Sequence, residues 1–342
     1  MPTEAQNFDV DNRSRQSQKK AELQLLSCIF TPSPHKKMNP KISIGLPVYN
    51  GENFLEEAIN SILNQTLDNF EIIISDNAST DRTKEICQQY GARDSRIRYY
   101  RNKENLGAAW NYNRVFELSR APFFKWASHD DLCAPQFLQC CLAELEKDPD
   151  LVLCHPKAHI IDCEGHVQSI YTENIGIEMP SAHQRFFQLL ETFGYYHGTQ
   201  IFGLIRASAL KKTKLIRPYA HSDRVLLAEL TLHGKFKEVP EFLFMRRIHP
   251  QVSQLANPSD RQFSIWFDPK NRKRASIPKL QRYLDYVRII SSCPLSFFEQ
   301  FQCYLQLLRR LFISKGFLRR MQGLLQDLYS GTFSKLNFPF PS

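Results

Sequence analysis

KISIGLPVYNGENFLEEAINSILNQT, residues 41–66, predicts a strand that runs directly into a helix. Residues 41–48 form a short, mostly apolar run of the kind found in buried strands. In residues 53–65 the apolar side chains recur every three or four positions, so they gather on one side of a helix. A strand followed by a helix is the repeating unit of an α/β fold.

A second unit of the same kind follows. FEIIIS, residues 70–75, predicts a strand, and STDRTKEICQQYG, residues 79–91, predicts a helix. We expect Ser79 or Thr80 to cap the start of this helix and Gly91 to end it.

The alternation of strands and helices continues along the chain. Its order favours an α/β protein whose mixed, mostly parallel sheet is flanked by helices, with ligands bound beyond the carboxyl ends of the strands. The further strand candidates are residues 97–101, 123–128, 151–155, 201–206 and 241–247, and the further helix candidates are residues 110–118 and 222–233.

Two adjacent carboxylates, Asp130 and Asp131, follow the apolar segment FFKWAS, residues 123–128. Carboxylates at the end of a buried strand can hold Mg²⁺ or Mn²⁺ against a diphosphate, because these ions need only one or two protein carboxylates besides water and phosphate oxygens. The alternative is that the two residues cap a helix that starts near Ala134.

The composition is that of a globular protein, with 42% hydrophobic and 23% charged residues among 342. We find no apolar run of about 18 residues that would span a membrane, and the polar N-terminus does not resemble a secretory signal, so we expect a cytoplasmic protein. Nine cysteines without a C-x-x-C pair indicate reduced thiols rather than disulfides or a zinc site. The net charge of +9 suits phosphorylated substrates, anionic lipids and nucleic acid equally well.

Four motifs follow one another along the chain: residues 41–66, EIIISDNASTDRT (71–83), NLGAAWN (105–111) and WASHDDLCAP (126–135). Together they resemble the family 2 glycosyltransferases, which have the GT-A type, Rossmann-like fold. They lie in family-like order over about residues 41–135, and weaker signals continue to His249. The resemblance implies a GT-A domain over residues 39–255. The polar composition of residues 1–38 predicts a disordered extension before this domain. The basic, helical pattern of residues 256–342 predicts a linker with amphipathic helices after it.

The resemblance places the nucleotide against the first two strand ends. Pro47, Tyr49 and Asn50 would form the first loop, and Asp76 would recognise the base, where a carboxylate can accept a hydrogen bond from a uracil-like N–H. The alternative for Asp76 is a turn residue that bonds its own backbone. Asp81 belongs to the same motif, although an acidic residue in the first turn of a helix is favourable by itself.

The turn from Asn105 to Gly107 would approach the sugar or ribose closely, or would be only a turn. The metal motif of the family is usually Asp-x-Asp, and here Ser128 replaces the first acid. Asp130 matches the metal-ligating carboxylate, whereas Ser128 would bond a hydroxyl of the nucleotide. The missing acid puts metal affinity in doubt, and for His129 we favour a positional role, since Mg²⁺ prefers oxygen ligands.

The resemblance also supplies a base and partners for the leaving group. Asp223, which opens a helix in HSDRVLLAEL, would remove the acceptor proton, and a plain helix cap is its alternative. In MRRIHP, residues 245–250, Arg246 or Arg247 would neutralise the diphosphate and His249 would add a metal contact. Specificity would lie around residues 195–203 and in the loop after Cys163.

The implied function is inverting transfer of a sugar from a nucleotide-diphosphate donor, most often UDP-linked in this family, to a hydroxyl of a glycan or lipid-linked glycan, with Mn²⁺ or Mg²⁺. The first rival is a catalytically inactive sugar-nucleotide-binding protein, because Ser128 replaces an acid. The second, a nucleic-acid-binding protein, has no recognised binding motif in its support.

Three C-terminal helices are expected, within residues 283–292, 297–312 and 316–328. They allow contact with the inner face of a membrane, or they pack on their own protein. Their apolar stripe and basic residues are Leu305, Leu308, Leu311 and Phe312, and Arg309, Arg310, Lys315, Arg319 and Arg320.

Overall fold

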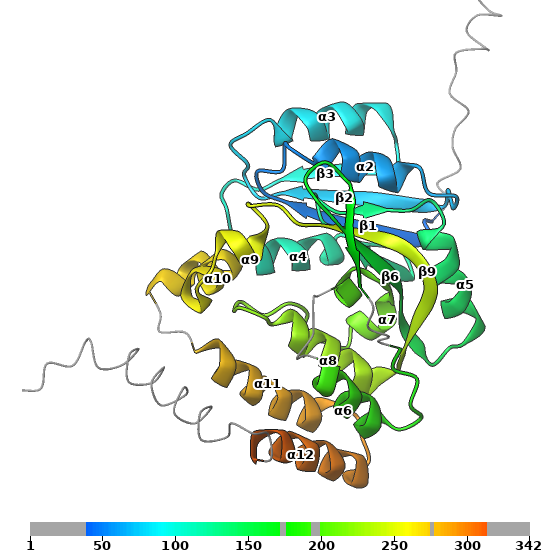
Figure 1. Ribbon diagram of the computed structural model, residues 1–342, viewed down its shortest axis with the longest axis vertical. Helices are drawn as coiled ribbons and strands as arrows, with labels where there is room; N and C mark the ends of the chain where they lie inside the picture. Colours follow the sequence, from blue (N-terminus) through cyan, green and yellow to red (C-terminus); the bar gives the residue numbers. More distant parts are fainter. Residues whose placement is uncertain (1–38, 172–175, 193–198, 274–276, 313–342) are drawn as a thin grey trace, which may run out of the picture. The chain divides into compact units, whose positions relative to one another are not determined.

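The structure is a computed structural model, and it describes residues 39–171, 176–192, 199–273 and 277–312 (Figure 1). The expected disordered extension, residues 1–38, lies outside the described residues. So do the last expected helix, residues 316–328, and residues 195–198 of the expected specificity segment.

Within these ranges, nine strands form one mixed sheet, which confirms the predicted α/β class. Eight of them lie in the order β3-β2-β1-β4-β8-β6-β9-β5, and β7 pairs with β6. The first four strands in this order are parallel, whereas β8 is antiparallel to both of its neighbours and β5 is antiparallel to β9. The bounds are β1 Ile42–Val48, β2 Phe70–Asp76, β3 Ile97–Arg101, β4 Phe123–Trp126, β5 Leu132–Cys133, β6 Leu151–Ile161, β7 Val167–Ile170, β8 Leu204–Arg206 and β9 Lys235–Arg247.

Helices cover the sheet on both faces. Figure 1 shows α2 and α3 on one face of β1–β3 and α4 on the other, while α6, α8, α11 and α12 form successive layers further from the sheet. The bounds are α2 Leu55–Leu63, α3 Thr83–Arg93, α4 Ala108–Glu117, α5 Phe137–Lys147, α6 Ala182–Thr192, α7 Ala207–Leu210, α8 Asp223–His233, α9 Ser253–Ala256, α10 Asp260–Phe267, α11 Pro278–Ser292 and α12 Phe297–Phe312, with 3₁₀ turns η1 Thr199–Phe202 and η2 Pro269–Lys273.

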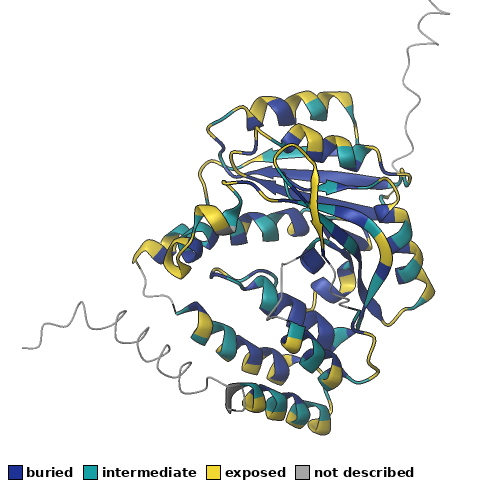
Figure 2. Cartoon of the chain, viewed as in Figure 1, coloured by how far each residue is buried: buried dark blue, intermediate teal, exposed yellow. Residues whose placement is uncertain are grey.

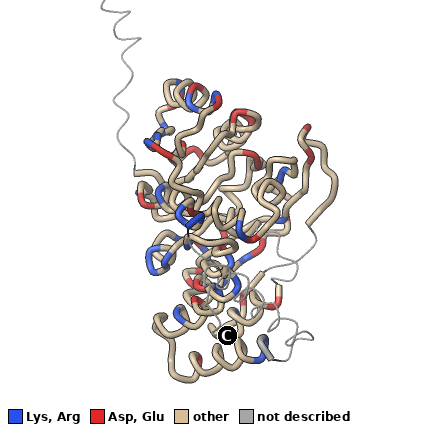
Figure 3. The backbone as a smooth tube through the Cα atoms, turned by 90° about the vertical axis from the view of Figure 1, so that its left-hand side faces the viewer, with Lys and Arg blue, Asp and Glu red and all other residues tan. Residues whose placement is uncertain are grey.

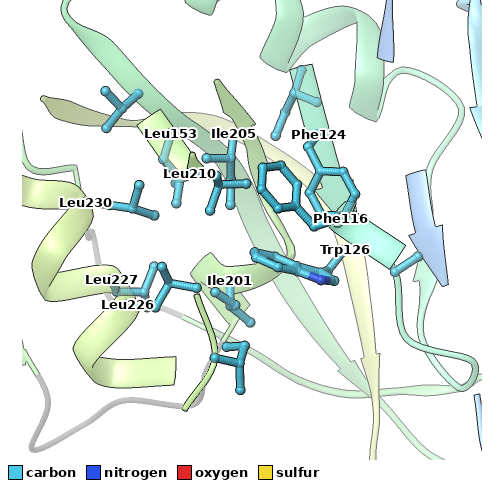
Figure 4. Packing of buried hydrophobic residues seen from close by; sticks show 14 of the residues in the cluster. Phe116, Phe124, Trp126, Leu153, Ile201, Ile205, Leu210, Leu226, Leu227 and Leu230 are labelled. Carbon is cyan, nitrogen blue, oxygen red and sulfur yellow. The ribbon is translucent and has the colours of Figure 1, made fainter. Parts of the chain in front are cut away.

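The core is continuous from the parallel strands to the helices beyond them. Every residue of β1 and β2 is buried, as expected for central parallel strands with helices on both faces (Figure 2). Aromatic rings fill the space between α4 and β4: Phe124 packs edge-on against Phe116, with ring centroids 5.0 Å apart, and against Trp126 at 4.9 Å (Figure 4). This packing fixes β4, whose carboxyl end leads to Asp130.

Two predicted helix boundaries are wrong. Helix α3 continues through Gly91 to Arg93, because burial of Ile86 and Cys87 outweighs the cost of about 1 kcal/mol for a glycine inside a helix. Its N-cap is Arg82, with no side-chain cap, so neither Ser79 nor Thr80 has the expected role.

Basic and acidic residues are interspersed along the described chain (Figure 3). No helix in the described ranges is both long enough and apolar enough to cross a membrane.

Candidate active site

A cavity of about 980 Å³ opens at the carboxyl ends of β1, β2 and β4. Its other walls come from the start of α8, the end of β9 and the segment from α9 to η2. The predicted site residues that line it are Pro47, Tyr49, Asn50, Asn105, Ser128, Asp130, Asp223, Arg246, Arg247 and His249. Asp76 and Gly107 are not part of the lining.

The first loop is tied to the loop after β2 by hydrogen bonds in both directions. The Asn50 N–H donates to Ser79 Oγ at 2.9 Å, and the Thr80 N–H donates to Asn50 Oδ1 at 2.9 Å. Asn50 has a φ of 52°, which asparagine tolerates better than most residues. These bonds hold the two strand ends together and leave Tyr49 exposed at the cavity.

Asp76 is completely buried, and its two oxygens already accept three hydrogen bonds. Oδ1 accepts from the Ser79 N–H at 2.8 Å, whereas Oδ2 accepts from the Tyr99 hydroxyl at 2.9 Å and from Arg101 Nη1 at 2.6 Å. The bond from the Ser79 N–H is a local contact between the Asp76 side chain and the backbone, as expected if Asp76 is a turn residue. The geometry therefore favours a structural role for Asp76 over the expected contact with the base.

Packing requires a glycine at position 107. Its φ is +90°, and a Cβ there would lie 2.5 Å from the carbonyl oxygen of Phe267 at the end of α10. Asn77 fixes the same turn, since its Nδ2 donates to Asn105 Oδ1 at 2.9 Å and to the Gly107 carbonyl at 3.2 Å. This turn thus fastens the C-terminal wall of the cavity to the sheet.

Asp130 is buried at the cavity between two polar partners. Ser128 Oγ donates a very short hydrogen bond to Oδ1, and His249 Nε2 lies 3.0 Å from Oδ2. Burial alone would raise the pKa of Asp130, but the charge of His129 and the hydrogen bonds from His249 and Ser128 outweigh it, so the pKa lies well below its ordinary value. The Asp130 carboxyl is therefore ionised at neutral pH.

Asp131 differs from its neighbour in partners and in charge. Its Oδ1 accepts the backbone N–H of Arg247 at 2.9 Å, and burial together with the negative Asp130 raises its pKa. Helix α5 begins at Phe137 with Gln136 as N-cap and no side-chain cap, so the alternative in which Asp130 and Asp131 cap a helix near Ala134 is wrong.

The two arginines at the end of β9 have different surroundings. The buried guanidinium of Arg247 donates to the carbonyls of Asp130, Asp162 and Cys163 and to Glu57 Oε2, and it covers the ring of Phe54. Arg246 also lines the cavity, and its side chain makes no hydrogen bond or ion pair with the described residues. This arrangement favours Arg246 for a diphosphate and a structural role for Arg247.

Asp223 is the first residue of α8 and faces the same cavity as Asp130. The N-cap is Ser222, whose Oγ donates to the Arg217 carbonyl at 2.7 Å instead of capping the helix. Burial raises the pKa of Tyr112, which lines the same cavity, and so do the charges of Asp130, Asp131 and Asp223.

The sequence interpretation missed part of the lining. Tyr112 on α4 lines the cavity, and so does His221, which has a φ of 63° and a pKa that burial lowers. Phe263 and Trp266 of α10, stacked with centroids 5.4 Å apart, form an aromatic wall in a segment predicted as a linker. The aromatic run FSIWF, residues 263–267, was the available signal.

The donor set fits a divalent cation that takes most of its ligands from elsewhere. Asp130 and His249 lie in contact, and His249 Nδ1 has no hydrogen-bond partner among the described residues. Those residues contain no group of three or more His, Cys, Asp or Glu side chains that could hold a metal ion. Mg²⁺ or Mn²⁺ bound here would complete its coordination with phosphate oxygens and water.

Comparison with known proteins agrees with this geometry. The family model "Glycosyl transferase family 2" matches residues 43–213, half of the chain. An uncharacterized glycosyltransferase of Haemophilus influenzae is 28% identical over 226 residues, which are 64% of this chain and 69% of that protein. The chondroitin synthase of Escherichia coli is 28% identical over 228 residues, 63% of this chain and 32% of the synthase.

A solved structure supports the fold independently. The crystal structure of S. aureus TarS 1-349 in complex with UDP-GlcNAc superimposes with a TM-score of 0.58 at 16% identity, over 85% of this chain and 80% of that one. The motifs, the sheet and the family match thus lead to one conclusion: the chain belongs to glycosyltransferase family 2 and has the GT-A fold.

Proposed function

We propose that this protein is an inverting, metal-dependent glycosyltransferase that moves a sugar from a nucleotide-diphosphate donor to a hydroxyl of a glycan or lipid-linked glycan. The observation that carries the proposal is the single cavity in which Tyr49, Asp130, Asp223 and Arg246 meet from four separate segments. UDP is the preferred nucleotide in this proposal, because TarS has been crystallised with UDP and with UDP-GlcNAc.

The nucleotide would bind along the first loop. Pro47, Tyr49 and Asn50 line that part of the cavity, with Ser128 beside them. Asp76 would act through the loop that it holds. Asn105 belongs to the fixed turn at the same side of the cavity, where the ribose or sugar would lie.

Asp223 would be the catalytic base. It is the first residue of α8, and it lines the cavity that also contains Asp130. The carboxylate takes the proton of the acceptor hydroxyl while that oxygen forms a bond to the anomeric carbon. The bond to the diphosphate breaks on the opposite face, and its electron pair leaves with the nucleotide, so the configuration inverts.

The diphosphate would be held by Arg246 together with Mn²⁺ or Mg²⁺ at Asp130 and His249. When bound, the cation would neutralise negative charge on the departing nucleotide. The low pKa of Asp130 keeps this carboxylate available at neutral pH.

A thermal-shift panel of nucleotide sugars, each with and without Mn²⁺, tests the proposal. A ligand at about 100 times its dissociation constant should stabilise the protein by about 2.7 kcal/mol. We expect one donor to give a metal-dependent shift and, with water or an acceptor, release of the nucleotide. If no nucleotide sugar shifts the transition with either metal, the proposal is wrong.

The panel also separates the rival functions. If a donor binds but neither transfer nor donor hydrolysis occurs with any metal, the protein is an inactive sugar-nucleotide-binding protein. The argument for this rival is that Ser128 replaces the first acid of the metal motif. The proposal includes a cytoplasmic location, at the inner face of the membrane, and no nucleic-acid partner.

A further inference from the structure

Helix α12, Phe297–Phe312, exposes apolar side chains along one of its sides. Cys303 and Leu307 are buried on the side that faces the protein. At about 100° per residue, the exposed set falls within about 100° of arc on another side of the helix. This apolar stripe consists of Phe297 (87% exposed), Phe298 (61%), Phe301 (54%), Leu305 (47%) and Leu308 (49%).

The stripe is too concentrated to be ordinary surface. Single exposed apolar residues are normal, whereas a contiguous apolar patch marks an interaction site. The sequence left open whether Leu305 and Leu308 pack inside the protein. They do not, because the side of α12 that packs on α6 and α11 is the other one.

The charge of the sequence in and after α12 indicates what covers the stripe. The acid of α12, Glu299, is paired with His183, and from Gln300 to Gln326 the sequence contains five Arg or Lys residues and no Asp or Glu. Arg309 is exposed and makes no ion pair with the described residues. A helix with an apolar side and flanking positive charge matches an anionic bilayer surface, where acyl chains receive the apolar side and headgroups neutralise the charge.

We propose that α12 lies in the interface of an anionic membrane, with the apolar stripe inserted between the headgroups. A second copy of the chain fits less well, because pairing two such surfaces would bring like charges together. The same argument disfavours residues 313–342 as the cover, since Lys315, Arg319 and Arg320 follow within eight residues of Phe312. The inference does not depend on the transfer reaction.

The test is sedimentation of the full-length protein with lipid vesicles. We expect binding to vesicles that contain phosphatidylcholine and phosphatidylglycerol, weaker binding as salt is raised, and little binding to phosphatidylcholine alone. The triple variant Phe297→Ser, Phe301→Ser, Leu305→Ser should weaken binding at least about tenfold. Arg309→Gln should weaken it about fivefold and reduce the salt dependence.

A matched control is available on β7, where Val167 and Ile170 are 56% and 50% exposed. The double variant Val167→Ser, Ile170→Ser removes exposed apolar side chains outside α12 and should bind vesicles like the original protein. Equal loss in the β7 variant would overturn the assignment to α12.

Two other outcomes also overturn the proposal. The first is that the original protein does not bind vesicles but forms a dimer in solution, and that the triple variant is a monomer. This result would assign the stripe to contact with a second copy of the chain. The second is that the original protein does not bind vesicles and that the triple variant unfolds at a lower temperature. This result would assign the stripe to contact with residues 313–342.

Discussion

The hydroxyl of Tyr219 donates a 2.5 Å hydrogen bond to Asp285 Oδ2, and this bond joins the loop before α8 to helix α11, 66 residues further along the chain. Arg217 Nε lies 3.1 Å from the same carboxylate, and the Arg217 carbonyl accepts the bond from Ser222. The buried carboxylate of Asp285 therefore holds the loop that ends at Asp223.

Asp285→Asn should lower the turnover number about tenfold while donor binding stays unchanged. The amide removes the charge opposite Arg217 and loosens the loop, and small displacements of a catalytic group cost much in rate. Nucleotide release measures turnover, and the donor-induced thermal shift measures binding. Arg288 contacts the other oxygen of Asp285 at 2.9 Å but is 71% exposed, so Arg288→Gln is the control and should change neither. If Asp285→Asn loses donor binding as much as turnover, Asp285 contributes to general stability rather than to the position of Asp223.

Asp130→Asn and Asp223→Asn should separate cation binding from proton transfer. The first variant loses the ionised oxygen next to His249 and should lose the metal-dependent part of the donor-induced thermal shift. The second should keep the whole shift and lose transfer by about a hundredfold or more, because it removes only the base. If Asp130→Asn keeps the metal-dependent thermal shift, the cation binds at another site.

The neighbouring arginines of β9 give opposite predictions. Arg246→Gln should leave the unfolding temperature unchanged and lower transfer about tenfold to a hundredfold, because a charge facing the diphosphate is lost. Arg247→Gln should lower the free energy of unfolding by about 2–4 kcal/mol, because a buried guanidinium with four hydrogen-bond acceptors is removed. Chemical denaturation and nucleotide-release assays on both variants check this, and a destabilised Arg246→Gln would reverse the assignment.

The sequence was sufficient for seven of the nine strands in the described ranges, all except β5 and β7, and for the part of the cavity formed by the strand ends and the start of α8. Apolar spacing predicted strand residues 97–101 and helix residues 297–312 with the bounds that the structure has. The carboxyl ends of parallel strands meet at one edge of a sheet, which is why residues as distant as Tyr49 and Asp130 could be expected to face one cavity.

What the sequence could not predict depends on neighbours from distant segments. Asp76 is engaged by Tyr99 and Arg101 of β3, and Gly107 is required by the carbonyl of Phe267. The choice between Arg246 and Arg247 depends on the carbonyls and the Glu57 carboxylate that surround the guanidinium of Arg247. No local pattern contains these contacts, because hydrogen-bond partners are decided only when the segments pack together.

The last prediction concerns pH and stability rather than the active site. Glu71 of β2 is buried and accepts hydrogen bonds from Ser43 Oγ at 2.7 Å, Arg98 Nη1 at 2.8 Å and Arg120 Nη2 at 2.6 Å. Burial would raise its pKa, but the bonds from Arg120, Ser43 and Arg98 outweigh burial, so the pKa in the folded protein lies below the ordinary value of 4.5.

Because the folded-state pKa is the lower one, the unfolded chain binds more protons as the solution is acidified. The contribution of Glu71 to the free energy of unfolding is therefore complete above about pH 4.5 and is lost as the pH falls through the folded-state pKa. Glu71→Gln should cost about 1–3 kcal/mol near neutral pH and should flatten the decline of stability in acid. Denaturant unfolding over the acid range measures both effects. The control is Glu146→Gln, at a surface ion pair with Lys41, which should leave the pH profile unchanged. A Glu71→Gln profile parallel to that of the original protein would contradict the lowered pKa.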